Sequence, residues 1–385
     1  MKKLRIGVIY GGRSSEHEVS LASAASVIAN LDRQRYDPVP IRIERDGRWT
    51  IPDRAPTAVV AAEVIAKARQ EANRAPRAGR EAYLVPHAGE ETLFTLERST
   101  GEMPGRENAY VAGLGLDIIF PVLHGPYGED GTIQGLLELA DVPYIGSGVL
   151  ASSVSMDKAM LKVCFVARQL PQVPHLVVLR QEWESAPAAT AALVEERLGY
   201  PVFVKPANLG SSVGISKVKS ADTLGAAMAL AAEYDRKIVI EGAVPEAREI
   251  ECSVLGNDRP EASIPGEILP SREFYDYEAK YLDESKVLVP APLDEAQAAE
   301  VRRLAVESFL AVDAAGFARV DFLLARGTGR LYVNEINTIP GFTTISMFPK
   351  LWEASGLEYP ALLDRLVQLA FERHAGKQGS RTTSP

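Results

Sequence analysis

The stretch Glu335-Ile-Asn337-Thr-Ile-Pro-Gly341 completes an apolar run that predicts a β-strand. A second predicted strand, shortly before it, carries Arg319-Val-Asp321-Phe. Because residues two apart on a strand point to the same face, the first and third side chains of each stretch point together. Two carboxylates, an amide and a guanidinium are therefore expected to form one cluster on this pair of strands.

The cluster has the oxygen ligands of a magnesium site. Mg²⁺ usually binds through a few carboxylates together with substrate phosphates. A buried salt-bridge network is the alternative, but two carboxylates beside one arginine leave negative charge, which favours a cation. Gly341, which follows directly, lets its N–H approach a ligand closely, and with Arg319 it would supply two donors to a developing oxyanion. A plain turn explains Gly341 equally well.

Composition and charge limit the function classes. The 385 residues predict two or three domains, and 46% hydrophobic with 24% charged residues is typical of a soluble globular protein. A net charge of −9 argues against nucleic acid as the main partner. No apolar run approaches the roughly 20 residues that span a bilayer, so no membrane partner is expected. The first ten residues predict a buried strand rather than a signal peptide, and a cytoplasmic location is expected. Cys164 and Cys252 lack the spacing of a disulfide framework or a zinc site.

Alternating apolar runs and helical patterns predict an α/β protein. Strands are expected at about 4–10, 36–44, 116–123, 142–145, 175–179, 201–205, 212–218, 237–241, 248–255, 317–324 and 330–335. Helices are expected from near Glu18 and at about 132–140, 151–169, 187–198, 221–234, 294–311 and 360–373.

This order predicts a doubly wound domain over 1–150, with a variable insertion at about 53–110. A central part over 151–245 and a C-terminal part over 246–374 follow. Within the latter, 271–292 is irregular and suits a lid. The polar residues 375–385 predict a disordered tail.

A loop rich in small residues follows the predicted strand that ends at Lys205. It reads Gly210-Ser-Ser-Val-Gly214, and loops of this kind cover phosphates. It matches neither the GxxxxGK[ST] pattern nor GxGxxG, and a flexible connector is the alternative. Lys158 is a further candidate cation. Glu241 is the last residue of another apolar strand, a position from which an acid can bind an adenine edge or ribose hydroxyls. Both are compatible with ordinary surface roles.

Loops that follow predicted parallel strands also carry polar residues. Glu16 lies in the first strand-to-helix loop, which faces the ligand crevice of a doubly wound domain. Its carboxylate could hold a substrate ammonium group. Ser15 and Glu18 have the spacing of a helix capping box, which leaves Glu16 available. His124 follows the strand at 116–123 on the same side, and a structural role for it is equally open.

Taken together, these segments resemble the D-alanine–D-alanine ligase family within the ATP-grasp superfamily. They occur in family order and span about 1–350. The matching stretches are Gly11 to Leu21, His124 to Gln134, Tyr144 to Gly148, Ser155 to Lys158, Lys205 to Gly214, Phe274 to Tyr281, Arg319 to Asp321 and Asn334 to Thr343.

The resemblance implies a biotin-carboxylase-like N-terminal domain followed by a two-part ATP-grasp fold. It implies ATP and two Mg²⁺ ions, with Mn²⁺ as a possible substitute, and a homodimer. The metal ligands would be Asp321, Glu335 and Asn337. The residues implied to hold ATP are Lys158, Lys205, Ser211, Ser212, Val213, Glu241, Val244, Glu249, Lys280 and Asn334.

Roles in catalysis follow from the same resemblance. Glu16 would bind the ammonium of a first D-alanine, with His124 near that substrate. Arg319 and the Gly341 N–H would form an oxyanion hole. Ser346, with Lys280, would engage the terminal phosphate or the carboxylate of a second substrate.

The lid residue Tyr281 would pin the closed lid through Ser211 and Glu16. The implied reaction forms D-alanyl-D-alanine for peptidoglycan synthesis through a D-alanyl phosphate. The run Tyr277-Glu-Ala-Lys-Tyr281 favours an amine over a hydroxyl nucleophile by resemblance. A D-alanyl-D-lactate or D-alanyl-D-serine ligase, another ATP-grasp carboxylate–amine ligase, and a regulatory protein without catalysis are the alternatives.

Overall fold

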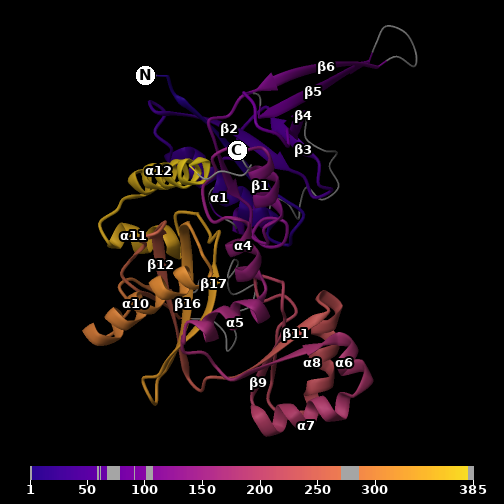
Figure 1. Cartoon of the computed structure of the whole chain (residues 1–385), viewed down its shortest axis with the longest axis vertical. Helices are drawn as coiled ribbons and strands as arrows, with labels where there is room; N and C mark the ends of the chain where they lie inside the picture. The colour runs from indigo at the N-terminus through magenta and orange to yellow at the C-terminus, as the bar shows by residue number, and fades with distance from the viewer. Residues whose placement is uncertain are drawn as a thin grey trace.

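The computed structural model describes residues 2–58, 60, 62–66, 79–90, 92–100, 107–269 and 286–379. Within these residues the chain folds around three β-sheets flanked by helices, which follow one another along the sequence (Figure 1). The N-terminal sheet lies at one end of the molecule and the central sheet at the other, with the C-terminal sheet beside them (Figure 1). The predicted α/β class is confirmed.

The N-terminal sheet has the strand order β6-β5-β4-β3-β2-β1-β7. Strand β1 (Leu4–Gly11) pairs in parallel with β2 (Tyr36–Ile43) and β7 (Ile118–Val122). Helices α1 (His17–Asn30) and α3 (Thr132–Leu139) follow β1 and β7. Loops that follow parallel strands open on one edge of the sheet, and this edge carries Glu16 and His124.

The insertion at 53–110 extends this sheet. Strand β3 (Trp49–Pro52) precedes the insertion, β4 (Gly79–Leu84) and β5 (Leu93–Thr100) lie within it, and β6 (Glu107–Leu114) runs past its end; neighbouring strands in this series are antiparallel. The strand expected at 142–145 reduces to a single bridge between Tyr144 and Ile119, because the chain turns away into α4 (Val149–Met156).

The helix expected at 151–169 is two helices, α4 and α5 (Lys158–Ala167). The break is at Asp157, whose carboxylate accepts hydrogen bonds from the N–H groups of Ala159 and Met160, both at 3.1 Å. Aspartate is a preferred N-cap because it satisfies such N–H groups at a helix start. A capping residue in the middle of the pattern therefore ended one helix and began another.

The central sheet has the order β10-β9-β11-β8, with antiparallel neighbours. Its strands are β8 (His175–Leu179), β9 (Val202–Pro206), β10 (Ser216–Val218) and β11 (Lys237–Gly242). Its helices are α6 (Arg180–Ser185), α7 (Pro187–Arg197) and α8 (Ala221–Tyr234). The strand expected at 212–218 begins only at Ser216, because left-handed backbone at Ser211, Ser212 and Gly214 forms a loop there.

The C-terminal sheet has the order β15-β14-β12-β16-β17, with β13 paired to β12. Its strands are β12 (Ala247–Gly256), β13 (Glu261–Ala262), β14 (Gly266–Leu269), β15 (Lys286–Leu288), β16 (Gly316–Ala325) and β17 (Leu331–Asn337). Its helices are α10 (Glu295–Ala311), α11 (Met347–Ala354) and α12 (Tyr359–Gln378).

Two predicted segments fall partly outside the described residues. Of the expected lid at 271–292, residues up to 285 lie outside, and 286–288 form β15. The expected tail at 375–385 starts too early, because α12 continues through Gln378; residues 380–385 lie outside. Among the residues described, no helix is long and apolar enough to cross a membrane.

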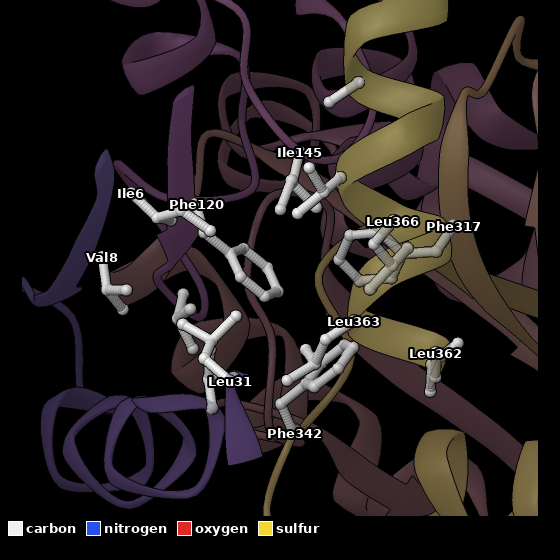
Figure 2. Close-up of a cluster of buried hydrophobic side chains, with 14 of the residues drawn as sticks. Ile6, Val8, Leu31, Phe120, Ile145, Phe317, Phe342, Leu362, Leu363 and Leu366 are labelled. Atoms are coloured by element: carbon white, nitrogen blue, oxygen red, sulfur yellow. The ribbon is translucent and has the colours of Figure 1, made fainter. Parts of the chain in front are cut away.

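One apolar cluster joins the N-terminal sheet to the C-terminal part of the chain (Figure 2). Phe120 on β7 packs edge-on against Phe342, with ring centroids 5.5 Å apart, and Phe342 lies 5.4 Å from Phe317 on β16. Leu362 and Leu366 of α12 complete the cluster. The loops at the carboxyl edge of the N-terminal sheet are therefore held against the end of β17.

Candidate active site

The paired strands β16 and β17 bring the four side chains of the predicted metal and oxyanion cluster together. Arg319 lies opposite Asn337, and Asp321 lies opposite Glu335. The register then shifts by one residue, which leaves Asn334 as the extra residue of a β-bulge. Bulges re-aim neighbouring side chains, and this one directly precedes Glu335.

Hydrogen bonds organise the cluster. The guanidinium of Arg319 donates two hydrogen bonds to the carboxylate of Asp321, both 2.6 Å long, and its Nε lies 3.0 Å from a carboxylate oxygen of Glu251. Asn337 donates from Nδ2 to Asp321 at 3.0 Å. Burial opposes the arginine charge, yet the carboxylates of Asp321, Glu251 and Glu335 hold the pKa of Arg319 well above its usual value.

Glu251 was missed by the sequence analysis. It lies on β12 directly opposite Asp321, and it is buried. Glu249, predicted to line an adenosine site, lies two residues earlier on the same strand and so shares a face with Glu251. The two acids inside an apolar strand are a signal that could have indicated Glu251. The sequence does not reveal, however, that this strand pairs with β16.

Glu16 lies buried in the loop between β1 and α1. The hydroxyl of Ser211 donates a hydrogen bond to its carboxylate, which links the first loop to the Gly/Ser loop of the central part. The predicted capping box is wrong. Helix α1 begins at His17 with Glu16 in the N-cap position, and Glu18 accepts a hydrogen bond from Arg45 instead.

The Gly/Ser loop has left-handed backbone at two non-glycine residues, Ser211 at φ 51° and Ser212 at φ 58°. Such conformations cost on the order of 1–3 kcal/mol and cluster at ligand sites. Val213 follows in the same loop. Lys158, at the start of α5, donates a hydrogen bond to the carbonyl of Leu209 at 2.6 Å. The loop and this lysine are thus held side by side.

Glu241 is a buried acid between two lysines rather than a surface residue. Its carboxylate lies 2.7 Å from Nζ of Lys162 and also pairs with Lys205. Burial opposes ionisation, but the ammonium groups of Lys205 and Lys162 hold the pKa of Glu241 well below its usual value. Lys162 was missed, although it follows Lys158 by one helical turn on α5. Val244 lies in the segment after β11.

His124 is buried at the end of β7. Its Nδ1 lies 2.9 Å from the carbonyl oxygen of Ile339, and its Nε2 lies 3.0 Å from the hydroxyl of Ser23. Burial lowers the pKa of His124. The ring therefore spans from the N-terminal sheet to the loop that carries Gly341.

Gly341 and Ser346 lie next to each other between β17 and α11. A Cβ at position 341 would lie 2.8 Å from Oγ of Ser346, so only glycine fits there without displacement. The Ser346 hydroxyl lies 2.7 Å from that of Thr343. Lys280 and Tyr281, the two predicted lid residues, lie outside the described residues.

Comparison with known proteins identifies the family. The profile described as D-ala D-ala ligase N-terminus matches residues 5–147, and D-ala D-ala ligase C-terminus matches 165–368. A relative from Heliobacterium modesticaldum, named D-alanine–D-alanine ligase, is 49% identical over 99% of this chain and 98% of its own length. The chain belongs to the D-alanine–D-alanine ligase family.

Other members of the family agree in sequence and fold. The D-alanine–D-alanine ligase from Solibacter usitatus is 48% identical over 98% of this chain and 99% of its own. The structure of the D-alanine–D-alanine ligase from Coxiella burnetii has a TM-score of 0.79 at 33% identity, covering 98% of this chain and 97% of its own. The VanG D-Ala:D-Ser ligase from Enterococcus faecalis has a TM-score of 0.76 at 32% identity, covering 96% and 100%. The expected fold and the ATP-dependent ligase class are confirmed.

Within this D-alanine–D-alanine ligase fold, the described residues form two connected groups. One contains the strand cluster around Arg319, together with His124, Gly341 and Ser346. The other contains the Gly/Ser loop with Lys158, Lys205 and Glu241. Glu16 joins the two groups, because its carboxylate accepts the hydrogen bond from Ser211 and its N–H donates to Ser14, whose hydroxyl donates to the carbonyl of His124.

Proposed function

We propose that this chain joins two D-alanine molecules in an ATP-dependent reaction that passes through a D-alanyl phosphate. Its product would be the D-alanyl-D-alanine used in peptidoglycan synthesis. The observation that carries the proposal is the cluster on β16 and β17, where Arg319 and Asp321 face Asn337 and Glu335. Full-length identity of 49% to a relative named for this reaction supports the choice of substrate.

ATP is proposed to bind between the central and C-terminal sheets. The Gly/Ser loop (Ser211, Ser212 and Val213), Lys158 and Lys205 would hold its phosphates, because cations and exposed N–H groups stabilise them. Glu241 would act by fixing Lys205. The segment around Val244, with Glu249 and Asn334, would complete the nucleotide site.

Two Mg²⁺ ions, or Mn²⁺ in their place, are proposed at Asp321, Glu335 and Asn337. The donor chemistry fits. Asp321 and Glu335 supply carboxylate oxygens and Asn337 an amide oxygen on the same face of the paired strands, and oxygen is the ligand atom that Mg²⁺ prefers. Among the described residues no three His, Cys, Asp or Glu side chains are placed to hold a metal, so the amide oxygen is part of the proposed set. Bound there, the ions would neutralise charge on the transferring phosphoryl group.

The chain's own groups would act in two stages. Glu16 would bind the ammonium of the first D-alanine, whose carboxylate oxygen attacks the terminal phosphorus of ATP while ADP leaves. The deprotonated amine of the second D-alanine would then attack the acyl carbon, and phosphate would leave as the C–O bond breaks. Arg319 and the Gly341 N–H would stabilise the intermediate oxyanion, where losing one donor typically costs roughly 10²–10³ in rate.

Three lid and loop residues would complete this site. Ser346 and Lys280 would bind the second carboxylate or the terminal phosphate. Tyr281 would close the lid over Glu16 and Ser211 and exclude water, which otherwise hydrolyses an acyl phosphate.

Phosphate release tests this function. Purified protein is given ATP and Mg²⁺ with D-alanine, L-alanine, D-serine or D-lactate. We expect release with D-alanine alone and formation of D-alanyl-D-alanine. No release with D-alanine would refute the proposal. Faster release when D-serine or D-lactate is added to D-alanine would favour the corresponding alternative ligase.

We further propose a cytoplasmic homodimer with domains at 1–150, 151–245 and 246–374. A cytoplasmic ligase has direct access to ATP. Light scattering after size exclusion tests the dimer, for which we expect about twice the mass of one chain.

A further inference from the structure

The segment from Ile339 to Phe342, which carries Gly341, is held by hydrogen bonds from the N-terminal part of the chain. The Ile339 N–H donates to a carboxylate oxygen of Glu129 at 3.1 Å. The Ile339 carbonyl lies 2.9 Å from Nδ1 of His124. The Phe342 N–H donates to the hydroxyl of Ser23 at 3.2 Å. Both residues that flank Pro340-Gly341 are therefore fixed.

The bonding around His124 determines which ring nitrogen carries the proton. The Ile339 carbonyl only accepts, so Nδ1 of His124 must donate. The Ser23 oxygen accepts the Phe342 N–H, so its own hydrogen is available for Nε2 of His124. These bonds form a closed ring with neutral histidine, as burial of the imidazole favours. Both ring nitrogens are occupied by the protein itself.

The carboxylate of Glu129 accepts hydrogen bonds from two different loops. One carboxylate oxygen accepts from the Gly125 N–H at 2.7 Å, next to His124, and the other accepts from the Ile339 N–H. The first loop belongs to the edge of the N-terminal sheet, and the second follows β17. A single side chain therefore links these two edges, in addition to the bonds made by His124 and Ser23.

The segment is also anchored by packing. The Phe342 ring lies in the apolar cluster of Figure 2, edge-on to Phe120 and Phe317. Of the described residues, none accepts a hydrogen bond from the Gly341 N–H. The neighbours of Gly341 are immobilised while its own donor is left for a ligand.

We propose that Ser23, His124 and Glu129 form a positioning frame, which fixes the backbone of 339–342 and thereby aims the Gly341 N–H at the reacting carbonyl. His124 thus acts through Ile339 rather than by touching substrate. The expected effect of the frame on reaction rate rests on the proposed ligase function. An error of about 1 Å in such a donor costs about 100-fold in rate, so three side chains dedicated to its position have a physical purpose.

The test uses Glu129→Gln and Ser23→Ala in the full chain. The glutamine has one acceptor oxygen, and its NH₂ would face a backbone N–H, so one of the two loops is released. Ser23→Ala removes the acceptor of the Phe342 N–H. We expect each change to lower kcat about 10- to 100-fold, with KM for ATP and the affinity for a non-hydrolysable ATP analogue within about twofold of the original protein.

Asp130→Asn is the matched control. Asp130 is the next acid in the chain and also accepts two backbone N–H bonds, from Tyr127 at 2.8 Å and Thr132 at 3.0 Å, but inside its own loop. We expect its kcat to stay within about twofold of the original value.

Amide hydrogen exchange supplies a readout independent of turnover. Exchange at Ile339 should accelerate in Glu129→Gln, and exchange at Phe342 in Ser23→Ala, without faster exchange in the central sheet. If exchange accelerates but kcat is unchanged, the frame does not position the donor and the inference is wrong. If neither amide exchanges faster, the frame itself is wrong.

The two proposals fail separately. If the original protein releases no phosphate with D-alanine, the proposed function fails, while amide exchange still tests the frame. If Glu129→Gln does not fold, Ser23→Ala carries the same comparison, because a lost hydroxyl in a helix removes little packing.

Discussion

The hydroxyl of Ser211 donates a hydrogen bond to the buried carboxylate of Glu16, across 195 positions of sequence. Ser211 belongs to the proposed phosphate loop and Glu16 to the proposed ammonium site. This hydrogen bond therefore links the proposed phosphate loop to the proposed site of the first D-alanine.

Removing this hydrogen bond should weaken binding of the first D-alanine. We expect Ser211→Ala to raise KM for D-alanine about tenfold, because Glu16 loses a hydrogen bond to a charged acceptor, typically worth about 1.5–3 kcal/mol. Initial rates at varied D-alanine and saturating ATP measure this. The neighbouring exposed Ser220→Ala provides the control, and an unchanged KM would contradict the proposed role.

Asp321→Asn should abolish turnover while the protein still folds. The carboxylate is proposed to hold a metal and also accepts two hydrogen bonds from Arg319. Phosphate release and a thermal melt measure the two outcomes. Asp258→Asn, an exposed acid in a turn beyond β12, should leave both unchanged. Near-normal rates in Asp321→Asn would exclude this residue as a metal ligand.

Gly341→Ala should reduce kcat much more than it reduces stability. The new methyl group would lie 2.8 Å from Ser346 Oγ, so either the Ser346 hydroxyl or the backbone that carries the proposed oxyanion donor must shift. A shift of about 1 Å costs about 100-fold in rate. Gly225→Ala in α8, where the Cβ meets nothing within 4 Å, should instead stabilise the protein by about 1 kcal/mol. Rates and urea unfolding of both variants decide this.

Glu241→Gln should destabilise the protein by about 3–5 kcal/mol, because it leaves two buried ammonium groups facing an uncharged side chain. Urea unfolding measures the free energy. Glu233→Gln, on the exposed face of α8, should change it by less than about 0.5 kcal/mol. Equal stability of the two variants would show that the buried lysine pair tolerates the loss of its counter-ion.

Stability should fall with acidification partly through His124. Burial lowers its folded-state pKa below 6.5, so under mild acid the unfolded chain binds a proton that the folded chain does not. Its contribution is present above about pH 6.5 and is lost as pH falls through the lower folded-state pKa. Urea unfolding at pH 8 and pH 5.5 should show a smaller difference in His124→Asn than in the original protein. An equal difference would mean that His124 is protonated when folded.

The strand cluster was predictable because strand periodicity is local. Arg319, Asp321, Glu335 and Asn337 lie at spacings of two, and two paired strands were enough to bring them together. Glu251 was not predictable, because its place in the cluster depends on β12 pairing with β16, which sets Glu251 opposite Asp321, 70 positions later in the sequence. Secondary-structure spacing reveals neighbours on one element, whereas pairing between distant strands is decided by the whole core.

Two further differences have similar origins. Asp157 divides the helix expected at 151–169. The break depends on hydrogen bonds from the backbone to the Asp157 side chain, whereas the helix was predicted from the spacing of apolar residues alone. Glu129 lies in a stretch that resembles the family, but its two backbone hydrogen bonds depend on the tertiary contact between the Gly125 loop and Ile339, which sequence spacing does not reveal. The roles of Lys280 and Tyr281 stay predictions.

The apolar cluster in Figure 2 has a consequence for synthesis of the chain. Ile6 and Val8 leave the ribosome long before Leu362 and Leu366 of α12, which belong to the same apolar cluster. The apolar face of the N-terminal sheet that lies in this cluster therefore cannot be fully buried until α12 has been translated. A nascent chain must keep that face from sticking to other molecules in the meantime, and a fragment ending near residue 150 would be prone to aggregate.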